Sequence, residues 1–152
     1  MSNKILCPTR GGKDSYPNQD RAVALAKERG VGVLFLYITN VDFLEHTAAP
    51  KLIDIEHEMD EMGEFMLAMA QERAEKADVS ASTLVKHGHF REVLCEVIEE
   101  YEIETVVLGS SAGGTGVVTG VYVRDLIDEI HGKIGVEFIV VDKGEIVGTY
   151  KP

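Results

Sequence analysis

The chain has 152 residues, of which 45% are hydrophobic and 27% charged, and these values fit one globular domain rather than a disordered or disulfide-stapled chain. Its 26 acidic and 15 basic side chains give a formal net charge of −11, which repels phosphate backbones and anionic lipids, so we expect no nucleic-acid and no membrane partner. No apolar run is long enough to span a bilayer, no signal-peptide pattern is present, and the two cysteines lack a CxxC spacing, so we expect a cytoplasmic protein.

Strand and helix patterns alternate from the start of the chain. Residues 4–8 form a short apolar run that ends at a proline, and a loop rich in turn-forming residues follows. A helix is predicted over residues 19–29, because apolar positions recur there at helical spacing and Gly30 follows. The nearly continuous apolar run over residues 31–38 predicts a strand buried on both faces, as in parallel sheets.

A long helix is predicted over residues 52–76. Apolar side chains recur in it every three or four residues, and we expect them to form core against the sheet rather than to line a ligand groove. These side chains are Leu52, Ile55, Met59, Met62, Phe65, Met66 and Met69.

The second half of the chain continues the alternation. Strands are predicted over residues 80–87 and 105–108, with a helix over residues 91–101 between them. The segment from residue 109 to residue 120 then holds five glycines, which allow the backbone amides to turn inward. A helix over residues 121–130 and a strand over residues 137–141 follow, and residues 146–150 can add a short terminal strand.

This order predicts a single doubly wound, Rossmann-like α/β domain with five mainly parallel strands and helices on both faces of the sheet. Parallel neighbours require crossover connections, and the helices supply them. Ligands of such sheets bind outside the carboxyl ends of the strands, where the winding direction reverses. We therefore expect the site at the loops after the first and fourth strands, which are also the loops richest in glycine.

Four sequence segments are informative as a set: Ile-Leu-Cys-Pro-Thr at the first strand, Leu-Phe-Leu-Tyr-Ile at the second, the Val-Lys-His-Gly turn, and Val-Val-Leu-Gly-Ser-Ser at the fourth. Together they resemble the universal stress protein family. The resemblance runs from about Lys4 to Val141 and implies a family domain over residues 1–141 with a C-terminal extension over residues 142–152. It also implies a homodimer and, in one branch of the family, an adenine-nucleotide site.

The nucleotide-binding branch carries Gly-x2-Gly-x9-Gly-Ser/Thr after the fourth strand. Gly109 matches its first glycine, and Ala112 stands at the second. Gly120 lies two residues early for the third glycine, and Val121 replaces the hydroxyl residue. Arg10 stands where the family commonly has an aspartate. The motif is therefore only partly preserved.

The glycine-rich loop still has physical reasons to bind an anion. Its glycines can form a nest of amides, Gly120 precedes a helix, and the guanidinium of Arg10 pairs well with phosphate or carboxylate. The alternative is that Arg10 pairs with an acidic side chain and the glycines only permit a turn. The resemblance implies adenine beside Ile38 and ribose and phosphates between Thr9-Arg10 and the loop. The candidate site residues are Pro8, Thr9, Arg10, Ile38, Gly109, Ser110, Ser111, Gly113, Gly114, Gly116, Gly120 and Val121.

The predicted function is that of a non-catalytic stress-response protein that binds an adenine nucleotide, such as ATP or AMP, or a related anion, without a metal. One alternative is a dimeric interaction module that binds no nucleotide. A second is an ATP pyrophosphatase, because residues 10–15 differ by one residue from the Ser-Gly-Gly-x-Asp-Ser loop of that class. Against it, we expect residues 16–18 to separate this loop from the next helix.

Two further patterns have ordinary structural explanations. Residues 109–113 match the Gly-x-Ser-x-Gly nucleophile elbow, with Ser111 as nucleophile, but a helix does not follow directly. His87 and His89 have only Glu92 near them in sequence as a possible third metal ligand. We therefore expect both histidines to be exposed and to form hydrogen bonds rather than to bind a metal.

The strand from Glu137 to Val141 is expected to be an edge strand of the five-stranded sheet. Open edges invite pairing, and the resemblance implies that two copies pair their last strands antiparallel. The extension after it, with Ile146, Val147 and Tyr150, can either fold back and cap this edge or reach across to a partner. We expect a homodimer through this strand, with the extension at the interface.

Overall fold

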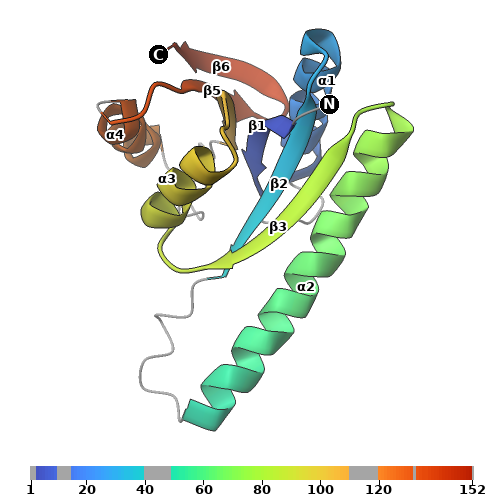
Figure 1. Ribbon diagram of the computed structural model, residues 1–152, viewed down its shortest axis with the longest axis vertical. Coiled ribbons are helices and arrows are strands. Elements are labelled where there is room, and N and C mark those ends of the chain that lie inside the picture. Colours follow the sequence, from blue (N-terminus) through green and yellow to red (C-terminus); the bar gives the residue numbers. More distant parts are fainter. Residues whose placement is uncertain (1–2, 10–14, 40–48, 110–119, 132, 152) are drawn as a thin grey trace.

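The computed structural model describes residues 3–9, 15–39, 49–109, 120–131 and 133–151 (Figure 1). Ten elements follow one another in an alternating order. They are β1 (Asn3–Pro8), α1 (Tyr16–Arg29), β2 (Gly32–Thr39), α2 (Ala49–Lys76), β3 (Ala81–His87), α3 (Phe90–Glu100), β4 (Thr105–Gly109), α4 (Gly120–His131), β5 (Glu137–Asp142) and β6 (Glu145–Tyr150).

The strands form one sheet in the order β3-β2-β1-β4-β5-β6. The first five strands are parallel to their neighbours, and β6 is antiparallel to β5. The doubly wound α/β prediction is confirmed, but the sheet has six strands instead of five. The predicted helices and strands are all present, and α1 begins at Tyr16, three residues earlier than expected, with a proline in its first turn.

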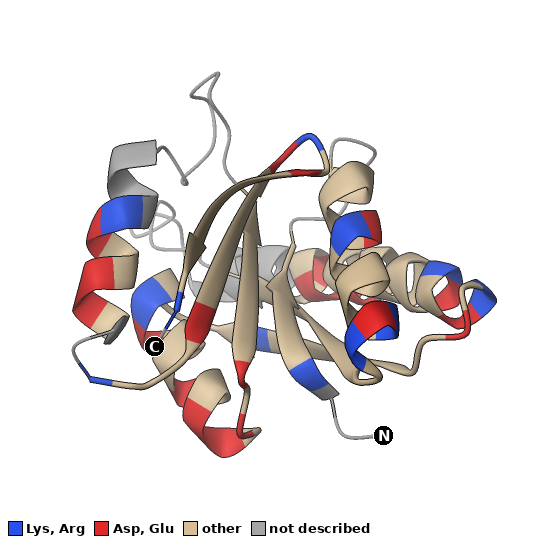
Figure 2. Ribbon diagram, turned by 90° about the horizontal axis from the view of Figure 1, so that it is seen from above, with Lys and Arg blue, Asp and Glu red and all other residues tan. Residues whose placement is uncertain are grey.

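Two hydrophobic clusters lie on the two faces of the sheet. Leu34 and Leu36 belong to the cluster that α3 and α4 cover, whereas Val33 and Phe35 belong to the cluster that α1 and α2 cover. Successive side chains of a strand point to opposite faces, so a continuous apolar run serves both clusters. Figure 2 shows the sheet between its two helical layers, with most charged residues on the helices and at strand ends.

The packing face of α2 differs from the predicted methionine stripe. Among residues 57–76, where the burial of this helix is described, the buried positions are Gly63, Leu67, Ala70 and Ala74. Small residues let the helix backbone approach the sheet closely, and a Cβ built on Gly63 would lie only 2.5 Å from Cδ1 of Tyr37.

The predicted apolar side chains from Met59 to Met69 therefore lie on its flank, whereas the side chains of Leu52 and Ile55 lie outside the described ones. Met62 and Phe65 are 57% and 65% exposed, so their assignment to the core was wrong. Met59, Met66 and Met69 are half-buried.

The C-terminal extension folds back onto its own chain. β5 pairs with β4 on one side and with β6 on the other, so the prediction that Glu137 to Val141 form an edge strand was wrong. Tyr150 explains the fold-back in part, because it pairs with Phe138 and packs against the core cluster. A dimer that pairs this strand with a second copy would have to displace β6.

Both cysteines are free, and Cys7 lies in the core. Burial raises the pKa of the Cys7 thiol to about 12, so it packs as a small apolar side chain. None of the described helices is long and apolar enough to cross a membrane.

Candidate functional site

The carboxyl ends of the five parallel strands meet at one edge of the sheet. The chain leaves β1 toward β2 on one side, and it leaves β4 toward β5 on the other, although β1 and β4 are neighbours. The winding direction therefore reverses between Thr9, just after β1, and Gly109, the last residue of β4. In doubly wound sheets this switch point is where ligands bind.

The structure describes six of the twelve predicted site residues. Pro8 ends β1 and Thr9 follows it, Ile38 lies near the end of β2, and Gly109 ends β4. Gly120 and Val121 are the first residues of α4, in agreement with the predicted position of Gly120 at a helix start. The other six lie outside the described residues: Arg10, Ser110, Ser111, Gly113, Gly114 and Gly116.

Two successive hydrogen bonds connect Thr9, at the switch point, to Gln19 of α1 and Arg73 of α2. Nε2 of Gln19 donates to Oγ1 of Thr9 at 2.7 Å, and Nη1 of Arg73 donates to Oε1 of Gln19 at 2.6 Å. Gln19 is 2% exposed, which makes it one of the few buried polar side chains of the described chain. A buried carboxamide needs such partners, because an unpaired one costs free energy.

Three further contacts hold the Arg73 guanidinium in place. Nη2 donates to the backbone oxygen of Tyr16 at 3.0 Å, the guanidinium pairs with Asp20, and its Cζ lies 4.0 Å from the centre of the Tyr16 ring. Helix α2 is thereby tied to the first turn of α1, next to Thr9.

Asn18 connects the ends of β4 and β5. Its Oδ1 accepts a hydrogen bond of 2.9 Å from the amide of Gly144, in the turn between β5 and β6. A Cβ added to Gly109 would lie only 2.9 Å from Nδ2 of Asn18. Gly109 thus leaves room for the Asn18 amide at the switch point. The same turn is held by Nε of Arg21, which donates to the oxygen of Gly144 at 2.6 Å.

Another polar cluster lies at the carboxyl ends of β2 and β3. The buried Thr39 donates from Oγ1 to Oδ1 of Asp60 at 2.9 Å, and Nε2 of His87 contacts the two oxygens of Asp60 at 2.8 and 2.7 Å. His87 therefore pairs with a carboxylate of α2. Within the described part of the chain, no three His, Cys, Asp or Glu side chains gather as a metal site.

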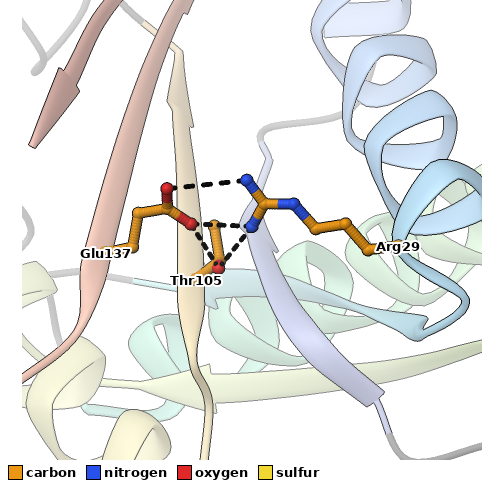
Figure 3. A network of polar contacts seen from close by, with 3 residues as sticks. All are labelled: Arg29, Thr105 and Glu137. Atoms are coloured by element: carbon orange, nitrogen blue, oxygen red, sulfur yellow. Dashed lines mark hydrogen bonds and ion pairs between the residues drawn. The ribbon is translucent and has the colours of Figure 1, made fainter. Parts of the chain in front are cut away.

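A network at the opposite end of the strands is structural. Arg29 ends α1, and it contacts Thr105 and Glu137, the first residues of β4 and β5 (Figure 3). Oγ1 of Thr105 also donates to Oε1 of Glu137 at 2.9 Å. These polar groups satisfy one another and lie at the amino ends of the strands, away from the switch point.

Sequence reasoning missed Asn18, Gln19 and Arg73. Asn18 and Gln19 were assigned to the loop and the helix start, and nothing local distinguished them from other polar residues. Arg73 lies 54 residues after Gln19, so only the packing of α2 against α1 brings the two together. The early start of α1 at Tyr16 also removes one argument against the pyrophosphatase alternative, because a helix does follow residue 15 at once.

A comparison with protein families identifies the fold's relatives. The model of the Universal stress protein family matches residues 1–129. This chain belongs to the universal stress protein family. No curated protein sequence matches it.

Solved structures of the family share the fold. Universal stress protein UspA from Lactobacillus plantarum has a TM-score of 0.71 at 14% identity, over 93% of this chain and 99% of that one. The universal stress protein from Archaeoglobus fulgidus in complex with dAMP has a TM-score of 0.56 at 15% identity, over 92% and 98%. A family protein from Arabidopsis thaliana with AMP bound has a TM-score of 0.58 at 16% identity, over 92% and 91%.

Proposed function

We propose that this chain is a non-catalytic stress-response protein that binds an adenine nucleotide, such as AMP or ATP, at the carboxyl edge of its sheet. The observation that carries the proposal is the switch point between Thr9 and Gly109, where the hydroxyl of Thr9 and the amide of Asn18 lie. Both groups can donate hydrogen bonds, and the oxygens of phosphate and ribose can accept them.

We place the parts of the nucleotide by analogy with the universal stress protein family. Adenine lies beside the backbone of Ile38, and ribose and phosphates lie between Thr9-Arg10 and the loop from Gly109 to Val121. The relatives solved in complex with dAMP and with AMP support an adenine mononucleotide as the ligand class.

Titration calorimetry and thermal melting test this proposal. AMP, ADP and ATP should each raise the melting temperature as their concentration rises, with about 2.7 kcal/mol of added stability at one hundred times Kd. GMP at the same ionic strength is the matched control, and it should stabilise the protein less. Unchanged melting with all three adenine nucleotides at millimolar concentration would contradict the site and favour the interaction module. Release of pyrophosphate from ATP, abolished by Asp14→Ala, would instead favour the enzymatic alternative.

We also propose a homodimer, now through the outer edge of β6. This edge has no partner among the described strands, and Ile146 and Val147 on it are 44% and 61% exposed. An antiparallel pair centred on Gly148 would bring Glu145 of one copy opposite Lys151 of the other, so the strand is complementary to itself. The C-terminal extension would then form the interface.

A further inference from the structure

Within the described part of the chain, α2 has two apolar faces, and only one of them packs on the sheet. The buried face consists of Gly63, Leu67, Ala70 and Ala74. A second row recurs at positions i, i+3, i+4 and i+7, the spacing of one side of a helix, and consists of Met62, Phe65, Met66 and Met69. We call this row the methionine flank. None of its side chains belongs to the core cluster between α2 and the sheet, so it is apolar surface that this packing leaves only partly covered.

The methionine flank includes an open aromatic ring. Phe65 is 65% exposed, more than any other large apolar side chain that the structure describes, and Met62 is also exposed. Met66 and Met69 are half-buried, and one turn after them Arg73 contacts the first turn of α1. Single exposed apolar residues are ordinary, but a continuous row of them marks an interaction surface, and Phe and Met are enriched at such surfaces.

Acidic side chains border the methionine flank. Glu58 and Glu61 are exposed and lie one helical turn before its two exposed members. The sequence from residue 57 to residue 72 contains no lysine or arginine. Glu61 approaches His57 at 3.0 Å, whereas Glu58 forms no ion pair with any side chain that the structure describes. The flank therefore offers apolar contacts beside negative charge, and a partner complementary to it is apolar and basic.

We propose that the methionine flank docks a basic amphipathic helix of another protein. A row with helical spacing fits the row of a second helix, and methionine side chains adapt to varied apolar surfaces. Lysine or arginine beside the apolar row of the partner would meet Glu58 and Glu61. A second copy of this chain fits less well, because it would bring the same acidic stretch against itself. Figure 1 shows that the beginning of α2 extends past the carboxyl ends of β2 and β3, so a partner can approach the helix there.

A labelled peptide of about 18 residues, built from leucine, lysine and alanine with the leucines on one helical face, is the probe. Fluorescence anisotropy with the full chain should show saturable binding in the micromolar range. Met62→Gln combined with Phe65→Gln removes the apolar flank but keeps good helix formers, and it should weaken binding by about tenfold or more. Tyr101→Gln removes an aromatic ring that is 41% exposed elsewhere, and it is the matched control that should bind as the unmodified chain does.

Charge reversal tests the basic character of the partner. Glu58→Lys combined with Glu61→Lys should weaken binding of the peptide several-fold, and added salt should reduce the difference. Glu96→Lys combined with Glu99→Lys, at exposed positions of α3, makes the same change in net charge and should have a much smaller effect. A peptide of identical composition whose leucines do not share one face should bind at least about tenfold more weakly than the amphipathic one.

The remaining outcomes would overturn the proposal. No binding of the amphipathic peptide, or equal binding of the scrambled peptide, would show that the flank recognises no apolar face. Equal affinity in the Met62→Gln, Phe65→Gln variant would place the contact elsewhere. A fall of more than about 5 °C in the melting temperature of this variant would show that the flank is covered by its own chain. A lower mass of the variant than of the unmodified chain in light scattering would make a second copy the occupant.

Discussion

The guanidinium of Arg29 and the carboxylate of Glu137 lie 2.7 Å apart where α1 ends and β5 begins. The side chain of Glu137 is mostly buried, and the hydrogen bond from Arg29 holds its pKa below the usual value of 4.5, with a smaller contribution from Thr105. This ion pair joins the end of α1 to β5, and the hydrogen bonds of Thr105 add the beginning of the neighbouring strand β4.

Glu137→Gln should lower the free energy of unfolding at pH 7 by about 1 kcal/mol, since the pair is partly exposed to solvent. Because the pKa of Glu137 is lower in the folded than in the unfolded chain, its contribution is present above pH 4.5 and is lost as the pH falls through the folded pKa. Urea unfolding at several pH values should therefore show a difference between the two proteins that shrinks in acid. Glu64→Gln, at an exposed position of α2, is the matched control and should change little. A constant difference down to pH 3 would contradict the assignment.

Gly63 is predicted to be required for the packing of α2 on β2. Alanine normally stabilises a helix relative to glycine by about 1 kcal/mol, but here its Cβ would lie 2.5 Å from the Tyr37 ring. Gly63→Ala should therefore destabilise the protein by about 1–3 kcal/mol in thermal or denaturant unfolding. In a Tyr37→Leu background the same change should be neutral or stabilising, and a loss of equal size in both backgrounds would mean that the ring is not the cause.

Gly109 and Asn18 are predicted to be coupled. A Cβ on Gly109 would push the Asn18 amide away, and the hydrogen bond from Gly144 to Asn18 would be lost with it. Gly109→Ala and Asn18→Ala should each cost about 1 kcal/mol in the free energy of unfolding, and the double variant should cost little more than either one. Additive costs would show that the two positions act independently.

The proposed dimer makes a charge-reversal prediction. Light scattering at micromolar concentration should give twice the chain mass of 16.7 kDa. Glu145→Lys or Lys151→Glu alone should weaken the dimer, because like charges would then face each other, and the double reversal should restore it. Asp128→Lys, at an exposed position of α4, controls for a change in net charge. A monomer mass for the unmodified chain would rule the interface out.

The α/β order, the parallel sheet and the location of the switch point could all be predicted from the sequence. Hydrophobic periodicity and turn residues such as Gly30, which ends α1 in a left-handed conformation, are local signals. Parallel strands and crossover connections then allow few topologies. Pro8, Thr9, Ile38 and Gly109 were placed at the carboxyl edge by the same reasoning.

Only the tertiary structure decided which face of α2 is buried and where the extension goes. The methionine flank and the small-residue face of α2 both recur at helical spacing, so periodicity cannot choose between them, and the close approach of the Tyr37 ring to Gly63 selects the small face. β6 caps β5 because Tyr150 gains a place on the core there. The hydrogen bond from Arg73 to Gln19 joins residues 54 positions apart in the sequence, and a local sequence pattern cannot predict a contact between residues so far apart.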